Sequence, residues 1–243
     1  MNVLLLRLEA PLMAFGGPIV DNYGVIQSFP AISMLTGLLG NALGWEHREA
    51  AALNRLQSRI RFAARLDRPG ERIIDYQTVD LGQDFMVDTG WTTWGQREVR
   101  GGASSTGTHI RYRHYRADAC ATVALALDSE EADLTVATLE QALITPARPL
   151  FIGRKTCLPA LPILQGKIKT PSVIEALRTL PAIYAKRVQA QWPADEEGPS
   201  LSRLVVLTDE RDWINQVHSG ERLVRQGELL LENHDALHDA NVS

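Results

Sequence analysis

The chain has 243 residues, of which 45% are hydrophobic, and a formal net charge of −4. This length and composition predict a real core in one large domain or two small ones, and the acidic balance argues against general affinity for nucleic acids. The longest apolar run, residues 119–127, is too short to cross a bilayer, and Cys120 and Cys157 form neither a disulfide framework nor a metal-spaced pair. We therefore expect a reduced, cytoplasmic protein that has no signal peptide and contacts no membrane.

A buried strand, a long loop and a glycine-bearing helix are predicted in the first 43 residues. Residues 2–8 are apolar and predict the strand, whereas residues 10–28 contain two prolines and three glycines and predict the loop. The helix is expected at 34–43, with Ser33 as its N-cap. Gly37 and Gly40 leave one helix face almost without side chains, which fits either tight packing or the close approach of a polyanion backbone.

A second helix is predicted at 46–57 and a half-buried strand at 59–66, where apolar and arginine side chains alternate. A turn at 68–70 leads to another strand at 73–79. Residues 80–108 then contain six glycines and two tryptophans, with little periodicity. We interpret this stretch as a protruding arm, on which Trp91 and Trp94 bind a partner unless the arm folds back and buries them.

Basic and aromatic residues interleave directly after the arm, as Arg-Tyr-Arg-His-Tyr-Arg at 111–116. Guanidinium groups neutralise phosphates and aromatic rings stack on bases, so this composition is typical of single-stranded RNA binding. A second basic segment lies within 141–174, which contains five basic residues and no acid. Two basic segments on an acidic protein predict a localised anion site, although solvated basic loops give the same charge pattern.

Strands and helices continue to alternate in the rest of the chain. We expect a buried strand at 119–127, an amphipathic helix at 130–143 capped by Asp128 or Ser129, and a strand at 148–152 that enters a basic loop at 153–159. After residue 164 we expect a helix within 171–182, an acidic loop at 191–200, and strands at 203–207 and within 221–232. The tail at 233–243 is expected to be frayed.

The predicted fold class is α+β. The order strand, helix, strand, arm, strand, helix, strand is the split βαβ pattern of ferredoxin-like domains, which also form the RRM-like RNA-binding module. A ferredoxin-like RNA-binding domain is expected at 1–165, with the inserted arm, or thumb, at about 80–117. Residues 166–243 are expected to form a small β-rich C-terminal unit.

Four ordered motifs resemble the fifth Cas protein family, which comprises CRISPR-associated RNA-binding proteins of the RAMP superfamily. They are Leu-Arg-Leu-Glu-Ala-Pro-Leu-Met-Ala-Phe-Gly at 6–16, the glycine-bearing stretch at 29–44, Asp-Tyr-Gln-Thr-Val at 75–79 together with 108–119, and Gly-Arg-Lys-Thr-Cys at 153–157. The match is to the members found in type I-E Cascade, the CRISPR surveillance complex. The arm is longer than is usual for the family, and the stretch after 165 matches weakly.

The resemblance implies a non-catalytic subunit, without a cofactor, that serves antiviral defence. Such subunits grip the 5′ handle of the guide RNA (crRNA), kink it with the arm and cap the backbone filament. The implied partners are a CasC-type backbone subunit and a large CasA-type subunit, and target DNA is reached only through the complex.

The candidate site residues combine this resemblance with the basic and aromatic pattern. Arginines are expected to contact phosphates and tyrosines to stack on bases, while Arg154 and Lys155 hold RNA backbone beside the first helix. The candidate RNA-binding residues are Ser33, Gly37, Gly40, Thr108, Arg111, Tyr112, Arg113, His114, Tyr115, Arg116, Arg148, Arg154 and Lys155. The candidate partner-binding residues on the arm are Trp91, Trp94, Arg97 and Arg100.

Two alternatives stay open. A related protein in type I-C systems cuts CRISPR repeat RNA, and metal-independent cleavage needs a base, an acid and a cation, which His114, Tyr115 and Lys155 would supply. A purely structural assembly subunit would instead bind protein through its arm, with RNA contact incidental. His234 and His238 lie one helical turn apart in the tail, which is too weak a signal to assign a metal.

Overall fold

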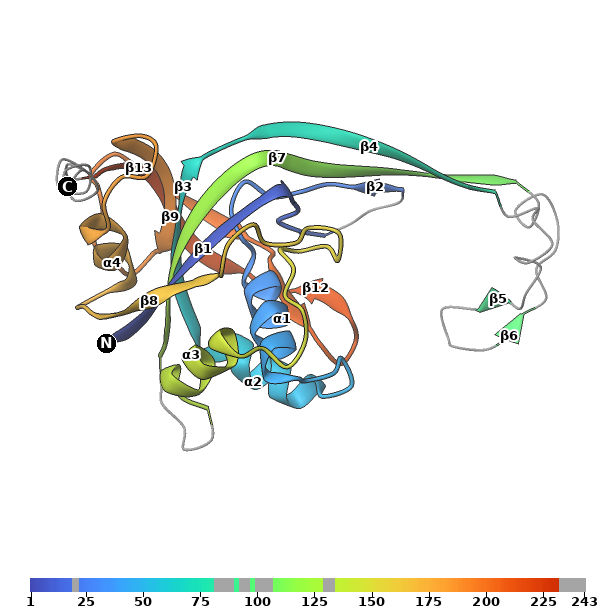
Figure 1. Cartoon of the computed structure of the whole chain (residues 1–243), viewed down its shortest axis with the longest axis horizontal. Helices are drawn as coiled ribbons and strands as arrows, with labels where there is room; N and C mark the ends of the chain where they lie inside the picture. The colour runs from blue at the N-terminus through green and yellow to red at the C-terminus, as the bar shows by residue number, and fades with distance from the viewer. Residues whose placement is uncertain (19–21, 81–89, 92–96, 99–106, 129–133, 232–243) are drawn as a thin grey trace, which may run out of the picture.

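The computed structural model describes the chain except for residues 19–21, 81–89, 92–96, 99–106, 129–133 and 232–243. A nine-stranded sheet dominates the described residues, with seven strands in the order β10-β13-β9-β3-β7-β1-β8 and with β2 and β4 also paired to β7. Helices α1 (Ile32–Leu43), α2 (Ala50–Arg59) and α3 (Val136–Ile144) lie on one side of it, and α4 (Val173–Thr179) packs on the other (Figure 1). The fold is thus a mixed α/β arrangement around a large, mostly antiparallel sheet.

The strand boundaries show how unequal the members of this sheet are. They are β1 (Asn2–Met13), β2 (Tyr23–Gly24), β3 (Ile60–Arg68), β4 (Glu71–Asp80), β7 (Thr108–Leu127), β8 (Leu164–Lys169), β9 (Arg187–Pro193), β10 (Ser202–Leu207) and β13 (Arg222–Leu230). Two separate hairpins pair β5 (Gly90–Trp91) with β6 (Arg97–Glu98), and β11 (Glu210–Asp212) with β12 (Val217–Ser219). None of the described helices is long and apolar enough to span a membrane.

β1 separates two hydrophobic cores, because successive side chains of a strand point to opposite faces. Leu4, Leu6 and Leu8 lie in the larger core with α1 and α3, whereas Val3 and Leu5 lie in the smaller core with α4. A strand buried on both faces has a continuous apolar sequence, so the strand predicted at 2–8 is confirmed.

A long hairpin of β4 and β7 leaves the body of the molecule (Figure 1). Its register runs without a bulge from the pair Glu71–Ala117 to the pair Asp80–Thr108. The tight connection at its root depends on Gly70, which has a φ of +63° and whose added Cβ would lie 2.3 Å from the Ala117 carbonyl oxygen. The predicted strands at 59–66 and 73–79 are confirmed, whereas the predicted turn at 68–70 is wrong, because β3 and β4 pair one after the other with the same edge of β7 and the chain does not reverse there.

Two predictions around the second helical region are wrong. Residues 148–152 form no strand, and the strand that returns beside β1 is β8. Pro149 has no amide hydrogen to give to a ladder, and Ile152 reaches the core from an irregular segment instead. Helix α3 begins at Val136 and is capped by Thr135, whose hydroxyl accepts a hydrogen bond from the Thr138 amide at 3.1 Å, and not by Asp128 or Ser129.

The predicted cap of the first helix is also wrong. Helix α1 begins at Ile32, after Ala31, so Ser33 lies inside its first turn and is buried. The carboxylate and carbonyl oxygens of Asp209 accept from the amides of Ile32 and Ser33 at 3.1 and 3.2 Å. Asp209, far along the chain, therefore caps the helix in place of Ser33, the cap predicted from the local sequence.

The strands after residue 165 extend the sheet of the strands before it. β9 pairs with β3 from Ala64–Gln191 to Leu66–Gln189, β13 pairs with β9, and β10 pairs with β13. No strand is predicted at 187–193, although Val188, Ala190 and Trp192 alternate there with polar residues and are buried. The division of the chain at 165 stays a prediction.

Candidate nucleic-acid interface

The projecting half of the β4–β7 hairpin has two faces with different chemistry, because side chains alternate along each strand and cross-strand partners share a face. One face starts at Ile73 and Tyr115, which pack with the large core, so it continues the side of the sheet that carries α1–α3. The next three cross-strand pairs outward on this face are Asp75–Arg113, Gln77–Arg111 and Val79–His109. We call these six residues the arginine face.

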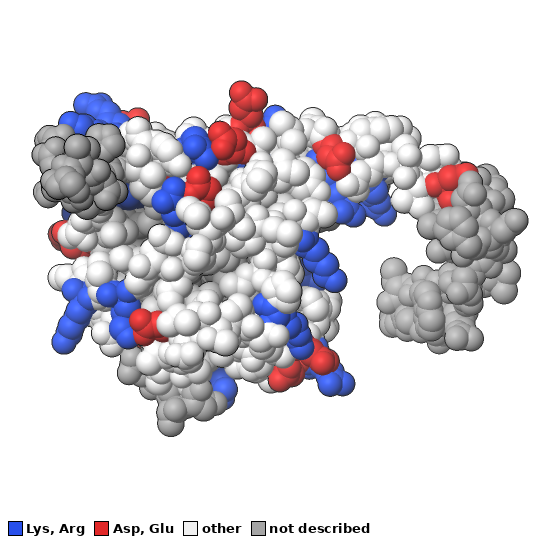
Figure 2. Space-filling model, in the orientation of Figure 1, with Lys and Arg blue, Asp and Glu red and all other residues white. Residues whose placement is uncertain are grey.

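Arg111 and Arg113 are exposed on the arginine face. Figure 2 shows basic side chains gathered on the underside of the hairpin, toward the hollow between the hairpin and the body. Asp75 lies across from Arg113, and its carboxylate accepts a hydrogen bond from the Gln77 amide at 2.5 Å. Two guanidinium groups against one carboxylate give the described part of this face a positive balance, which suits a phosphate backbone.

The opposite face carries aromatic and aliphatic residues, in the pairs Ile74–His114, Tyr76–Tyr112 and Thr78–Ile110. Tyr23 of β2 stacks on Tyr112, with ring centroids 4.9 Å apart and an interplanar angle of 9°. Tyr76 meets Tyr112 edge-on at 5.4 Å and 62°. We call these six residues together with Tyr23 the tyrosine face. The interleaved arginines and tyrosines of the sequence therefore lie on opposite faces, and Tyr112 cannot stack on RNA that lies against Arg111 and Arg113.

Tyr115 and Arg116 are buried, with exposed fractions of 3% and 9%. The Arg154 guanidinium lies over the Tyr115 ring at 4.7 Å. Arg116 donates to the Pro69 carbonyl at 2.7 Å, and burial lowers the pKa of its guanidinium. Burial removes the surface that base stacking by Tyr115 and phosphate contact by Arg116 would need.

Arg154 binds the root of the hairpin together. Its two terminal nitrogens donate to the carbonyls of His114 and Gly24, both at 2.8 Å. Gly153 before it has a φ of +88°, and an added Cβ would lie 1.8 Å from the Ala14 carbonyl oxygen. The family motifs at 6–16, 108–119 and 153–157 thus meet at this root. Lys155 is exposed on the same loop. Arg154 instead holds the hairpin root through its hydrogen bonds to two carbonyls, a role that the sequence does not indicate.

The helix face of Gly37 and Gly40 is covered by protein. A Cβ at Gly40 would lie 2.7 Å from the Leu53 Cδ2 atom of α2, and a Cβ at Gly37 would lie 3.5 Å from the Trp213 ring. Tight packing, one of the two readings of this face, explains Gly40, whereas a Cβ at Gly37 would make only an ordinary van der Waals contact. The packing leaves no room there for a polyanion backbone.

The N-terminus of α1 already holds an anion. The Asp209 carboxylate that accepts from the Ile32 amide is itself held by the Arg222 guanidinium at 2.6 and 3.1 Å. A carboxylate at a helix N-terminus neutralises the positive end of the helix dipole. Ser33 therefore lies beside a filled site.

The other predicted residues do not converge on the hairpin root. Arg148 donates to the Trp45 carbonyl at 2.8 Å, just beyond the C-terminal end of α1. Thr108 is exposed at the outer end of β7, across from Asp80. Trp94 and Arg100 lie outside the described residues, and only the backbone is described for Trp91 and Arg97, which face each other in β5 and β6.

The residues proposed for RNA cleavage are not assembled as a catalytic set. His114 and Tyr115 are neighbours on β7, so their side chains point to opposite faces, and the Tyr115 ring lies under Arg154. Both cysteines are buried free thiols, and burial raises the pKa of Cys120 to about 11. A thiol with such a pKa is not a nucleophile at neutral pH.

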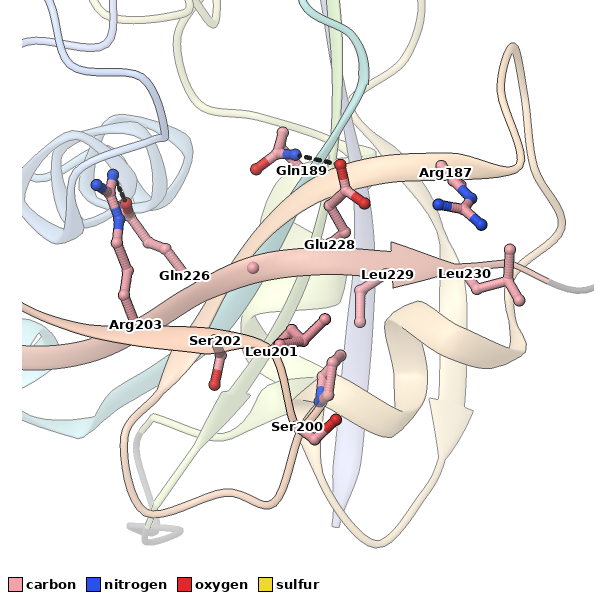
Figure 3. Close-up of a pocket in the computed structure, with 12 residues that line it drawn as sticks. Arg187, Gln189, Ser200, Leu201, Ser202, Arg203, Gln226, Glu228, Leu229 and Leu230 are labelled. Atoms are coloured by element: carbon pink, nitrogen blue, oxygen red, sulfur yellow. Dashed lines mark hydrogen bonds between the residues drawn. The ribbon is translucent and has the colours of Figure 1, made fainter.

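A groove of about 760 Å³ lies on the C-terminal strands and has no counterpart in the sequence predictions. It forms where β13 runs on to Leu230, past the last β10–β13 pair, Ser202–Gly227 (Figure 3). Its polar groups bind one another: Gln189 donates to Glu228 at 3.1 Å, and Arg203 donates to Gln226 at 2.9 Å. The strands that line the groove, β9, β10 and β13, pair with neither strand of the hairpin, so the groove does not belong to the arginine face.

Comparison with known proteins agrees with these features. The family model for the CRISPR-associated protein Cas5 (Cas5d) matches residues 3–225. The chain is 32% identical over 178 residues to the CRISPR system Cascade subunit CasD of Escherichia coli strain K12. The aligned residues cover 72% of this chain and 75% of that protein.

Two solved structures share the fold. A chain of a CRISPR RNA-guided surveillance complex matches with a TM-score of 0.67 and 23% identity, over 94% of this chain and 90% of its own. A crystal structure of a Cas protein matches with a TM-score of 0.61 and 24% identity, over 94% of this chain and 95% of its own. On the family model and the relative from Escherichia coli together, the chain belongs to the Cas5 family of CRISPR-associated proteins.

Proposed function

We propose that the chain is a non-catalytic subunit of a type I-E Cascade surveillance complex, in which it binds the 5′ handle of the guide RNA and caps the backbone filament. The observation that carries this proposal is the placement of Arg111 and Arg113 on the face of a projecting hairpin that continues the helical side of the sheet. Its neighbours in the complex are a CasC-type backbone subunit and a CasA-type large subunit. Family membership and the likeness to CasD support the assignment.

RNA is held, in this proposal, between the hairpin and the helical side of the body. Side chains two residues apart on a strand face are separated by roughly 6.6 Å along the strand, so the two arginines address successive points of one RNA backbone. Arg154 keeps the root of the hairpin closed, and Lys155 adds an exposed cation on the loop beside it. The grip is electrostatic, so it weakens as salt rises.

The strand order supports the finer fold assignment as well. β3, β7, β1 and β8 pair antiparallel in that spatial order, which fits the proposed split βαβ pattern, with the fourth strand, β8, running past the proposed boundary at residue 165. β9, β13 and β10 continue the sheet beyond β3 and make up the proposed C-terminal unit. The proposed cellular location of the protein is the cytoplasm.

Filter binding of the purified chain to handle RNA and to scrambled RNA, over a range of salt concentrations, tests the proposal. We expect tighter binding to handle RNA, and we expect the double variant Arg111→Ala/Arg113→Ala to lower the salt slope by about one unit for each arginine. Arg187→Ala is the matched control, because Arg187 is an exposed arginine on β9, which pairs with neither strand of the hairpin.

Three outcomes would contradict the proposal. Equal affinity for handle and scrambled RNA would favour a purely structural subunit with incidental RNA contact. An unchanged salt slope in the double variant would exclude the arginine face as the binding surface. Cleavage of repeat RNA in the presence of EDTA would show a metal-independent ribonuclease, and we expect the RNA to stay intact.

A further inference from the structure

A row of polar side chains crosses the C-terminal strands on the side of the sheet that carries α1–α3. Gln191 of β9 is the cross-strand partner of Gln226 of β13, and Gln226 is the partner of Arg203 of β10. On its other edge Gln191 is paired with Ala64 of β3, which belongs to the large core. Because cross-strand partners share a face, the row lies on the same side of the sheet as the arginine face.

The hydrogen bonds of this row all run in one direction. Arg203 donates to the side-chain carbonyl of Gln226 at 2.9 Å (Figure 3), and the Gln226 amide donates to the side-chain carbonyl of Gln191 at 3.1 Å. A guanidinium can only donate, so Arg203 fixes the orientation of both side-chain amides. The amide nitrogen of Gln191 is therefore a donor at the end of the row.

This donor belongs to a buried side chain and lacks a protein partner. Gln191 has an exposed fraction of 3%, and its amide nitrogen has no hydrogen-bond partner among the described residues. Buried polar groups in proteins are almost always hydrogen-bonded, and an exception calls for an explanation. Gln191 lines a pocket, so whatever fills that pocket can supply the acceptor.

The pocket beside Gln191 has a volume of about 230 Å³, and we call it the glutamine pocket. Its walls are the loop 27–31 before α1, the row described above, and residues 205–209 of β10 and the turn after it. Its two charged side chains already bind other side chains, since Asp209 is paired with Arg222 and Arg203 donates to Gln226. Sites for drug-sized ligands have volumes of roughly 300–1,000 Å³, so this smaller, polar pocket suits a single uncharged ring system.

We propose that the glutamine pocket takes one splayed-out nucleobase of the bound RNA, and that Gln191 donates a hydrogen bond to an acceptor on the edge of that base. The inference rests on the proposed function and names a place where the RNA sequence is read, whereas the arginine face contacts phosphates. Specific recognition of single-stranded RNA uses bases that leave the stack and hydrogen-bond through their edges. An uncharged ring with edge acceptors is what the pocket accommodates.

The pocket lies within reach of RNA on the arginine face. Its loop 27–31 continues from Gly24, whose carbonyl accepts from Arg154 at the hairpin root. Phe29 in the pocket wall follows Gly24 by five residues, so the two are at most roughly 18 Å apart. Both surfaces lie on the helical side of the sheet, so one RNA strand can follow the hairpin and place a base in the pocket.

Filter binding of full-length variants to handle RNA and to scrambled RNA of the same length tests the proposal. Gln191→Leu removes the donor, and we expect it to lower the preference for handle RNA by about fivefold or more, the effect of losing a contact to a base edge. The salt slope is expected to stay unchanged, because no phosphate contact is lost. Gln189→Leu is the matched control, since Gln189 lies on the same face of β9 and donates to Glu228.

A second variant and a set of modified RNAs make the test independent of the folding of Gln191→Leu. Ser28 is exposed at the pocket wall, so Ser28→Trp is expected to fill the pocket without disturbing the core and to cause the same loss of preference. Ser200→Trp, at an exposed serine of the C-terminal groove, is its control. Handle RNAs with one abasic nucleotide identify the base: at one position the lesion is expected to weaken binding to the unsubstituted chain but not to the two pocket variants.

Each contrary result has a distinct meaning. Equal weakening of handle and scrambled RNA by Ser28→Trp would overturn the proposal, because the pocket would then hold RNA backbone and not a base. Full preference for handle RNA in Ser28→Trp would also overturn it, as would abasic lesions that act alike on this variant and on the unsubstituted chain. Failure of the proposed function is recognised separately, because only then does the unsubstituted chain bind both RNAs equally or Arg111→Ala/Arg113→Ala leave the salt slope unchanged, and the base site falls with it.

Discussion

The two halves of β7 follow different rules. Residues 119–127 lie between β3 and β1, and every one of them is buried, with alanine at four of the nine positions. Residues 108–114 pair with β4, carry β2 on part of their other edge, and alternate between exposed and half-buried side chains. In the inner half the size of each side chain is restricted, because packed layers cover both faces of the strand. In the outer half the side chains are exposed or half-buried, and each face has its own chemistry.

This contrast separates stability from recognition along a single strand. Changes around the inner half are expected to affect unfolding, whereas changes in the outer half are expected to affect binding with little effect on unfolding. The root of the hairpin, where Arg154 and Gly153 lie, is the boundary between these regions. Substitutions on each side of this boundary test the contrast.

The largest loss of stability is expected for Arg65→Met, beside the inner half. The Arg65 guanidinium is fully buried, pairs with Asp67 at 2.8 Å, and donates to the carbonyls of Leu177, Leu180 and Pro181 at the end of α4. Removing it leaves a buried carboxylate without its cation, which costs about 3–5 kcal/mol. Urea unfolding measures this loss, and a loss below about 1 kcal/mol would contradict the assignment of Arg65 to the core.

The same variant has an expected pH dependence. Burial already raises the pKa of Asp67 above its ordinary value, against the pull of Arg65, and removing Arg65 raises it further. A carboxyl whose folded-state pKa lies above the unfolded one destabilises the fold increasingly as pH rises toward that folded-state pKa. The loss is therefore expected to be smaller at pH 5 than at pH 8, and a loss independent of pH would contradict this account.

An intermediate effect is expected for Gly153→Ala at the boundary. The glycine has a left-handed φ, and the new Cβ would collide with the Ala14 carbonyl, so the loop must move or strain by about 1–3 kcal/mol. Thermal unfolding measures the cost. Gly16→Ala is the control, since a Cβ there meets nothing within 4 Å and the position has no positive φ. Equal midpoints for the two variants would show that the root tolerates displacement.

The smallest change in stability is expected when residues 81–107 are replaced by Asn-Gly. Asp80 and Thr108 are cross-strand partners, so a two-residue turn closes the hairpin in its present register. The free energy of unfolding is expected to change by less than about 1 kcal/mol, because loop length has little effect on closure entropy. Assembly on guide RNA is nevertheless expected to fail, as native mass spectrometry of the co-expressed complex would show. A full-size complex that contains the shortened subunit would contradict the role of the arm.

Local periodicity predicts most of the elements and the chemistry of the hairpin. The apolar residues around Leu4, Leu6 and Leu8 predict β1, and the arginine and tyrosine residues at 111–116 predict a basic and aromatic segment. The separation of Arg113 from Tyr112 follows from strand alternation, once 111–116 is assigned to a strand. The same alternation at 73–79 would have placed Tyr76, which is not among the predicted site residues.

Long-range contacts account for what the sequence could not predict. Gly24 accepts from Arg154, 130 residues away, and Gly40 has its Leu53 neighbour in another helix. Neither contact leaves a pattern in the nearby sequence. From the sequence alone, Arg154 is therefore interpreted as a phosphate ligand and Gly40 as part of an exposed helix face. Burial of Tyr115 and Arg116 likewise depends on where the hairpin leaves the body, which no periodicity within β7 marks.

The Asp209 cap of α1 has a consequence for how the chain folds during synthesis. Helix α1 leaves the ribosome early, but the carboxylate that accepts from its first amide belongs to a residue 177 positions later. Chains emerge from the N-terminus at about 5–20 residues per second, so the helix waits on the order of ten seconds or more for its cap. Contacts of such large sequence separation also slow folding after release. The cap of helix α1, near the start of the chain, is thus completed only when the C-terminal segment that contains Asp209 has been synthesised.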